Sequence, residues 1–434
     1  MSLKEKETHQ ETSSSDDEDD DRYIPPEITF NILSRLPVKA LFRFKCVSKE
    51  WRTLICQPRF VSTHLTRSPS SLIIHAHRAP IAAAEKKEAQ PKPNKKTQVI
   101  RPDGHVIYVY GPPKSLPRKL STIDRILDFP GSDAAGFIDP LVLIGGPNGV
   151  VCVAQGQKRF FKTFTLWNPA TRSRKSVPSD PLLEPNPKLY HLSSAGLGFD
   201  PSRNEFKVIH IMRHRNVKKP DVAKFFSSRA GEWKMVSQPA GRPASFWVKN
   251  QACEAVVGGI PYWRATVRDV YVRGSDPKER DSLVWFDVRD DVFGSEPYAW
   301  DNDGREMCLG EIKDCLCVGV WDKGMGSNAG LDVWVKENES GSWNPRYRVG
   351  SLKRVRAGLE KGVVVGFCGN TLIVQQFGEQ GDLIILDLKK VPIVDGQNSV
   401  SQAQAEELIN FRDALPFTFK TMRYKESFTD IPKM

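Results

Sequence analysis

The sequence has little of what membrane and secreted proteins carry. In its 434 residues no apolar run approaches the roughly 18 residues that a bilayer-spanning helix needs, and its first twenty residues are polar and acidic. The eight cysteines are spread over more than 300 residues, without the density of a disulfide framework. We therefore expect a soluble protein with no membrane association, located in the nucleus, the cytoplasm or both.

Signatures of common catalytic sites are also missing. The chain contains neither the G-x-S-x-G nucleophile elbow nor the G-x-x-x-x-G-K-[ST] phosphate loop. The glycine-rich segment 324–330 departs from the dinucleotide-binding pattern and precedes no helix, so we interpret it as a loop between strands. These absences predict a protein without catalytic residues and without a cofactor.

Metal-ligand patterns are weak. Cys308, Cys315 and Cys317 lack the nearby histidine or second cysteine pair that zinc spacing requires, so we expect them to pack in a core. His75 and His77 share one face of a strand-like run without an acidic or cysteine partner pattern. The sequence therefore predicts no metal site.

Charge is distributed unevenly along the chain. Residues 1–22 hold nine acidic and three basic residues, so their net charge is −6. Because the whole chain has a net charge of +11, the remaining residues carry about +17. Low hydrophobicity and high charge predict that this tail is disordered. Elsewhere lysine and arginine are scattered, with local clusters at 86–96 and 213–219 that we interpret as solvated loops.

Residues 24–66 have the pattern of short helices. Pro37 ends a first helix and suits the start of a second, Ser48 is a candidate N-cap for a third, and Pro58 stops it. The apolar face of the first helix is formed by Ile28, Ile32, Leu33 and Leu36. A segment of this size is near the lower limit for a self-sufficient core, so its apolar faces need a partner or the neighbouring domain.

From about residue 70 the pattern changes to short β-branched and aromatic runs separated by turn residues. Hairpin turns recur at intervals of 55, 55, 55 and 56 residues, at Asn148, Arg203, Gly258, Lys313 and Gly369. Each is followed by a third strand and several by a fourth. Four-stranded units in series are typical of β-propeller blades, because one blade cannot bury both of its faces alone.

A sixth unit is weaker. It begins near "SLIIHA", uses a turn at Asp103-Gly104 and is interrupted by a polar insert at 81–98. Near the C-terminus we expect a short helix at 404–411, followed by a tail that completes a blade by pairing the two ends of the domain. Four tryptophans at repeat positions are expected in the blade core rather than on a nucleic-acid stacking platform: Trp167, Trp285, Trp334 and Trp343.

Two parts of the chain resemble known families. The pieces "IPPEI", "ILSRLPVKAL", "RFKCVSKEW" and "FVSTHL" resemble the F-box motif, particularly its plant form. The region after them is similar to the F-box-associated domain, a kelch-like propeller, in "PNGVVCV", "LWNPATRSRKSVP", "LGFDPSRNEFKV", "VWFDV", "DVWV" and "YKES". We thus expect a mainly β protein with an N-terminal α unit: an acidic tail (1–22), an F-box (23–66) and a propeller (67–434).

The resemblance implies a function. F-box proteins dock on a Skp-type adaptor that bridges to a cullin and a RING subunit, while the second domain captures a protein substrate for ubiquitination. Trp51 and Leu54 are expected to pack the third helix. The positions that match the motif, and that we expect at the adaptor interface or in its immediate support, are Ile24, Pro25, Ile28, Ile32, Leu33, Leu36, Pro37, Leu41 and Val47.

Other interpretations remain open at this point. The chain could bind the adaptor as a scaffold without promoting degradation. The helical unit could instead be a helix-turn-helix nucleic-acid binder, given Arg43, Lys45, Lys49, Arg52 and Arg59, although Pro37 in the joint and the interspersed apolar residues disfavour it. An enzymatic propeller lacks any recognisable catalytic constellation.

Overall fold

The computed structural model describes most of the helical and strand regions of the chain. The predicted disordered tail, the turns at Asp103-Gly104 and Gly369, the insert at 81–98 and the loop at 324–330 lie outside the described residues. The described ranges are 24–78, 105–110, 125–126, 141–157, 160–179, 189–216, 221–237, 245–268, 279–300, 305–322, 331–349, 362–368, 371–376, 383–388, 405–409 and 417–431.

The N-terminal unit is helical. It contains α1 (Pro26–Leu33), α2 (Val38–Phe44), α3 (Lys49–Cys56) and α4 (Pro58–Arg67). Ser48 caps α3 as predicted, because its hydroxyl accepts hydrogen bonds from the backbone N–H groups of Glu50 and Trp51. Pro58 ends α3, also as predicted, but it starts a fourth helix as well, since a proline at the first position loses no helical hydrogen bond.

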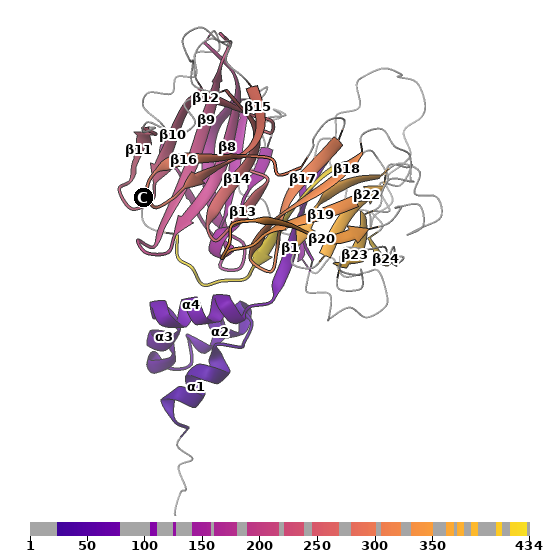
Figure 1. The fold of residues 1–434 in the computed structure, drawn as a ribbon. Helices are drawn as coiled ribbons and strands as arrows, with labels where there is room; N and C mark the ends of the chain where they lie inside the picture. The colour runs from indigo at the N-terminus through magenta and orange to yellow at the C-terminus, as the bar shows by residue number, and fades with distance from the viewer. Residues whose placement is uncertain are drawn as a thin grey trace, which may run out of the picture.

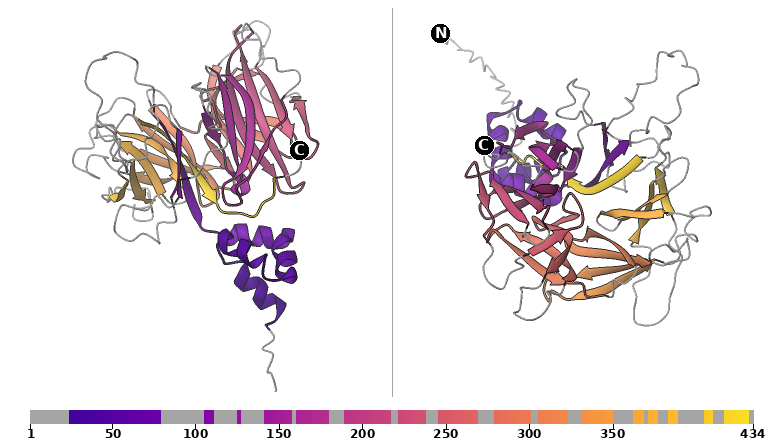
Figure 2. Two further views of the ribbon diagram at one scale, coloured as in Figure 1. Left: turned by 180° about the vertical axis from the view of Figure 1, so that it is seen from behind. Right: turned by 90° about the horizontal axis from the view of Figure 1, so that it is seen from above.

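The remainder is a ring of antiparallel sheets. Among the described residues the strands form six sheets, which we number as blades 1 to 6 in ring order (Figure 1 and Figure 2). Blade 1 contains β25 (Phe417–Lys425), β1 (Ser70–Arg78), β2 (His105–Tyr110) and β3 (Arg125–Ile126). Blade 2 contains β4 (Leu141–Ile144), β5 (Val151–Gln157), β6 (Phe160–Asn168) and β7 (Ser173–Ser176).

Four blades follow in chain order. Blade 3 contains β8 (Tyr190–Asp200), β9 (Glu205–His214), β10 (Val222–Ser227) and β11 (Glu232–Met235). Blade 4 contains β12 (Ser245–Val248), β13 (Ala255–Val257), β14 (Ile260–Arg268), β15 (Glu279–Asp287) and β16 (Val292–Pro297). Blade 5 contains β17 (Arg305–Ile312), β18 (Cys315–Asp322), β19 (Leu331–Lys336) and β20 (Trp343–Val349). Blade 6 contains β21 (Gly362–Cys368), β22 (Thr371–Gln376), β23 (Leu383–Asp387) and β24 (Ala405–Ile409).

The ring is closed by strands from its two ends. C-terminal β25 pairs antiparallel with β1 over nine residue pairs, from Ser70 opposite Lys425 to Arg78 opposite Phe417. This pairing completes blade 1, which corresponds to the weak sixth unit of the sequence pattern. It confirms the expected closure. It also leads the segment that follows β25 past the helical unit (Figure 1).

The repeated turns explain the period seen in the sequence. Among the described turns, those at Asn148, Arg203 and Lys313 join the first two strands of blades 2, 3 and 5 and contain left-handed backbone, with φ of 52° at Asn148, 49° at Asn204 and 50° at Lys313. Asparagine and glycine tolerate this conformation, so the turn residues mark the repeat. In blade 4 the turn is formed by Gly258 and Gly259, which also have positive φ.

The expected helix at 404–411 is wrong. Residues Ala405–Ile409 form β24, which pairs with β23 at the outer edge of blade 6. Alanine, glutamate and leucine favour a helix in isolation, but helix propensities are small, and pairing with an existing strand outweighs them.

Buried apolar side chains lie mainly between neighbouring blades. One cluster joins blades 2, 3 and 4, a second joins blades 1 and 2, a third joins blades 4 and 5, and a fourth joins blades 5 and 6. Each blade therefore buries its faces against its neighbours. The predicted propeller fold with an N-terminal helical unit is confirmed.

Candidate protein-interaction site

The helical unit has a small core of its own. Leu33, Val38, Leu41, Ile55 and Phe60 are almost fully buried in it. Partly buried side chains pack around them, among them Leu36, Trp51 and Leu54. The expectation that Trp51 and Leu54 pack the third helix agrees with these positions.

Exposed apolar side chains are concentrated on the same unit. Of the seven large hydrophobic residues that are exposed in the described part of the chain, five belong to the helical unit. Ile24, Ile28 and Ile32 are 58%, 48% and 52% exposed; Ile28 and Ile32, four residues apart, lie on one side of α1, and Ile24 precedes this helix. Val47, after α2, is 69% exposed. A concentration of exposed apolar side chains on one small unit marks a contact site for another protein.

The nine positions expected at the adaptor interface fall into two groups. Leu33 and Leu41 are buried, at 3% and 0% exposure, and Leu36 is partly buried, so these three support the unit from inside. The six that are exposed are Ile24, Pro25, Ile28, Ile32, Pro37 and Val47. The surface available for docking therefore lies on α1 and on the two connections that flank α2. In Figure 1, α1 is the helix farthest from the propeller and α4 the nearest.

A buried histidine holds the joint between α1 and α2. His64 on α4 is 3% exposed, and its Nε2 donates a hydrogen bond to the carbonyl oxygen of Leu36 at 2.9 Å. Burial lowers the pKa of His64, against the raising effect of this bond, and so favours the neutral ring. Arg67 adds a second tie by donating to the side-chain oxygen of Asn31 at 3.0 Å.

Two of the five cations that motivated the nucleic-acid interpretation lie over aromatic rings. Lys45 Nζ is 5.4 Å from the centroid of the Phe42 ring and 4.8 Å from that of Phe428. Arg59 Cζ is 5.6 Å from the centroid of Phe30. These contacts hold both cations against aromatic side chains of the unit and its neighbour Phe428, where Lys45 is partly buried and Arg59 is exposed.

The helical unit meets the propeller through the C-terminal segment. Phe428 is 4% exposed and packs into the helical core. Its ring centroid lies 5.2 Å from that of Phe42 and 5.5 Å from that of His64. Sequence reasoning missed this residue, because nothing local distinguishes a phenylalanine that packs more than 350 residues away.

A cleft of about 930 Å³ lies between α4 and the adjacent face of the propeller. Val61 and Leu65 line it from α4, while Glu311 and Arg423 line it from the ring. Arg423 on β25 pairs with Glu311 and, at 2.8 Å, with Asp314, so it ties the closing strand to blade 5. Burial raises the pKa of Glu311 to about 7, against the lowering effect of Arg423.

Cys317 and His75 are buried, Cys308 and Cys315 are partly buried, and the side chain of His77 lies outside the described residues. Cys317 is fully buried in the core between blades 5 and 6, and Cys308 packs against the same core. His75 is 5% exposed on β1. Over the ranges that the structure describes, no group of three or more His, Cys, Asp or Glu residues is placed to hold a metal ion.

The repeat tryptophans also pack between strands. Trp167 is 4% exposed in the core of blades 1 and 2. Trp334 and Trp343 pack against the core of blades 4 and 5. Trp285 is partly buried, and its ring lies 6.2 Å from that of Tyr262. The expectation of a blade-core role holds for these side chains.

None of the helices in the described part of the chain combines the length and the apolar character that crossing a bilayer requires.

Two family models match this chain. The F-box domain model matches residues 23–63, which contain the exposed apolar surface. The F-box associated beta propeller domain model matches residues 129–353, more than half of the chain.

The relatives of this chain carry F-box names. One F-box protein of Arabidopsis thaliana is 27% identical over 50% of this chain and 49% of its own length, so that alignment spans about half of the relative. An F-box/kelch-repeat protein of Arabidopsis thaliana is 24% identical over 74% of this chain and 78% of its own length. A third F-box protein of the same plant is 22% identical over 84% of this chain and 79% of its own length. The chain therefore belongs to the plant F-box proteins that carry an F-box associated β-propeller domain.

Proposed function

We propose that this protein is the substrate-recognition subunit of a Skp-cullin-F-box ubiquitin ligase. The observation that carries the proposal is the exposed apolar surface formed by Ile24, Ile28, Ile32 and Val47 on a unit that matches the F-box. Water-exposed isoleucines at this density need a protein partner. For an F-box, that partner is a Skp-type adaptor, which joins the chain to a cullin and a RING subunit.

The mechanism in this proposal is positioning without catalysis by the chain itself. The helices fix the protein to the ligase, and the propeller holds a protein substrate near the ubiquitin carrier. Holding two reactants together raises their effective concentration, so transfer by the other subunits becomes faster. The place of action would be the nucleus, the cytoplasm or both.

Adaptor binding is the first test, and α1 offers a clean variant. We expect an Ile28→Ala, Ile32→Ala double substitution to weaken binding of a purified Skp-type adaptor by at least about tenfold, because each exposed side chain would bury apolar area on docking. Neither residue belongs to the helical core, so the fold should survive. Titration calorimetry with the full-length chain gives the affinity directly.

The matched control is Met235→Ala. Met235 is 56% exposed on β11 in blade 3, so this substitution removes exposed apolar surface from the propeller instead of the helices. Its adaptor affinity should equal that of the unsubstituted protein. Failure of the folded, unsubstituted protein to bind any Skp-type adaptor would refute the proposal.

A scaffold without a degradative role shares the adaptor-binding prediction, so a second experiment separates it. Reconstitution of the chain with adaptor, cullin, RING subunit, ubiquitin and carrier enzyme should yield ubiquitin transfer to proteins captured by the propeller. Complete assembly without any transfer would favour the scaffold.

A further inference from the structure

The last described residues, 426–431, form a strap between the propeller and the helical unit. On the propeller side, the Asn168 side-chain amide donates to the carbonyl oxygens of Ser427 and Thr429, each at 3.0 Å. The Ser427 hydroxyl donates to the carbonyl oxygen of Asn148 at 2.7 Å. These bonds hold the strap to two turns of blade 2.

The end of the strap is anchored as well. Ile431 is 4% exposed in the core shared by blades 2, 3 and 4. Lys175 Nζ on β7 donates to the carbonyl oxygen of Ile431 at 2.6 Å. The strap is therefore fixed to the ring both before and after Phe428, whose side chain points the other way, into the helices.

Phe428 reaches the adaptor side of the helical unit through one intermediate residue. Its ring lies edge-on to His64, with centroids 5.5 Å apart. His64 in turn donates to the carbonyl oxygen of Leu36 at 2.9 Å. Leu36 precedes Pro37, and this pair forms the joint between α1 and α2; of the six exposed docking positions, Pro37 lies in this joint and Ile32 lies at the end of α1 beside it.

Closure of the ring places the strap. Residue 426 directly follows β25, whose pairing with β1 closes blade 1. The helical unit is joined covalently to the propeller by a two-residue link between α4, which ends at Arg67, and β1, which begins at Ser70. The pairing of β25 with β1 therefore fixes where the strap begins, and the bonds to blade 2 fix its course beside the helices.

We infer that the strap makes adaptor docking depend on a closed propeller, with Phe428 as the positioning residue that supports the Leu36–Pro37 joint through His64. This inference rests on the proposed function. Its consequence is selective recruitment: a chain with an incomplete propeller, unable to hold substrate, presents a weakened docking surface and enters the ligase less readily.

The test compares three variants of the full-length chain. Phe428→Ala removes the ring, and Phe428→Leu keeps an apolar side chain of intermediate size. Phe293→Ala is the matched control, because Phe293 is 1% exposed within blade 4 and packs on Phe246 and Phe286, away from the helices. Two quantities are measured: hydrogen exchange of residues 36–44 and 58–67 in the free protein, and affinity for a purified Skp-type adaptor.

We expect Phe428→Ala to accelerate exchange in both segments and to weaken adaptor binding about tenfold, within the usual range of coupling between distant sites. Phe428→Leu should recover most of the affinity. Phe293→Ala should lower the melting temperature while leaving helical exchange and adaptor affinity unchanged at temperatures where the protein is folded.

Unchanged affinity in Phe428→Ala would overturn the inference, as would an equal loss in Phe293→Ala, which would indicate general destabilisation. The exchange measurement needs no adaptor. If the unsubstituted protein binds no adaptor, the proposed function fails, while faster helical exchange in Phe428→Ala alone would still show that the strap supports the helices.

Discussion

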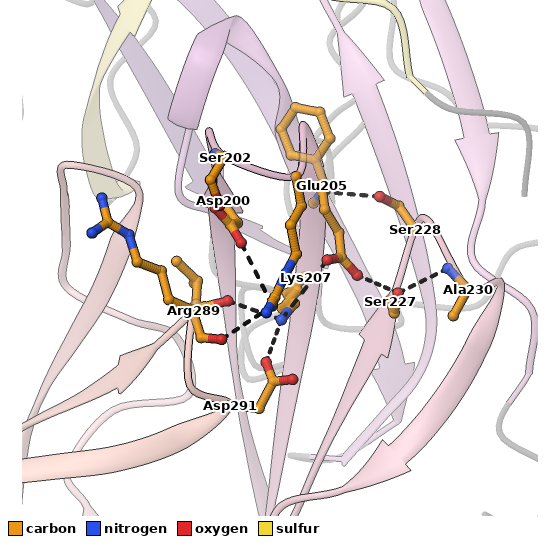
Figure 3. A network of polar contacts seen from close by, with 12 residues as sticks. Asp200, Ser202, Glu205, Lys207, Ser227, Ser228, Ala230, Arg289 and Asp291 are labelled. Carbon is orange, nitrogen blue, oxygen red and sulfur yellow. Dashed lines mark hydrogen bonds and ion pairs between the residues drawn. The ribbon is translucent and has the colours of Figure 1, made fainter.

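Lys207 is a buried cation that connects two blades. It is 1% exposed, and its Nζ donates to the carbonyl oxygen of Val288 at 2.8 Å and to the carboxylate of Asp291 (Figure 3). Glu205 lies 3.9 Å away and accepts a hydrogen bond from Ser227. The segment "LGFDPSRNEFKV" thus joins blade 3 to the outer turn of blade 4, which gives its charged residues a structural role.

Removing this cation should be costly. We expect Lys207→Met to destabilise the protein by about 3 kcal/mol, because Glu205 and Asp291 would lose their counter-charge in a largely buried site. Chemical denaturation measures the loss. Lys234→Met is the control: Lys234 pairs with Glu232 on the surface, at 47% and 61% exposure, and its loss should change stability by less than about 0.5 kcal/mol. Equal effects of the two substitutions would contradict this account of Lys207.

The roles of single residues differed in how well the sequence alone could predict them. Ser48 and the turn at Asn148 were predictable, because a cap and a left-handed turn depend on neighbouring residues alone. The sequence could not predict that Leu33 and Leu41 are buried while Ile28 and Ile32 are exposed, because all four are apolar residues at helical spacing. Only packing against α3 and α4 separates the supporting residues from the docking residues.

At the scale of elements, closing strand β25 carries an ionisable contact that links pH to stability. Arg423 on this strand pairs with Glu311 of β17, whose side chain is 14% exposed. Burial raises the pKa of Glu311 from 4.5 to about 7. The folded state therefore binds this proton more tightly than the unfolded state does, so stability is lost as the pH rises from about 4.5 to about 7, and the loss is complete above about 7.

This sign gives a prediction for Glu311→Gln. Glutamine stays neutral, so the variant should gain stability relative to the unsubstituted protein as pH rises from about 5 to 8, by about 3 kcal/mol. Thermal denaturation across this range measures the difference. Glu232→Gln, at a side chain that is 61% exposed, controls for the substitution itself. A stability difference for Glu311→Gln that is constant with pH would show that the carboxyl is not buried in this way.

Elements were predictable where local pattern and tertiary context agree. The interval of about 55 residues identified the blades, because the described hairpin turns of blades 2 to 5 all contain left-handed backbone. The segment Ala405–Ile409 was misassigned as helix, since its strand state depends on pairing with β23. The separate helix α4 was missed because Pro58 both ends α3 and begins α4.

At the scale of the whole molecule, the exposed apolar surface and the propeller lie at opposite ends. The helix α1 points away from the ring, and α4 faces it (Figure 1 and Figure 2). Docking through α1 would leave most of the ring free to hold a substrate. No local sequence signal predicts this arrangement, because it depends on Phe428, which joins the helical core from the far end of the chain.

The measurement that tests the central claim most directly is a hydrogen-exchange footprint of a purified Skp-type adaptor on the full-length chain. The account predicts that the adaptor slows exchange in residues 24–47, where the exposed docking positions lie, and leaves strands β4 to β24 unchanged. Protection confined to the propeller, or none in residues 24–47 at saturating adaptor, would contradict the claim that this chain is a ligase receptor docked through its helices.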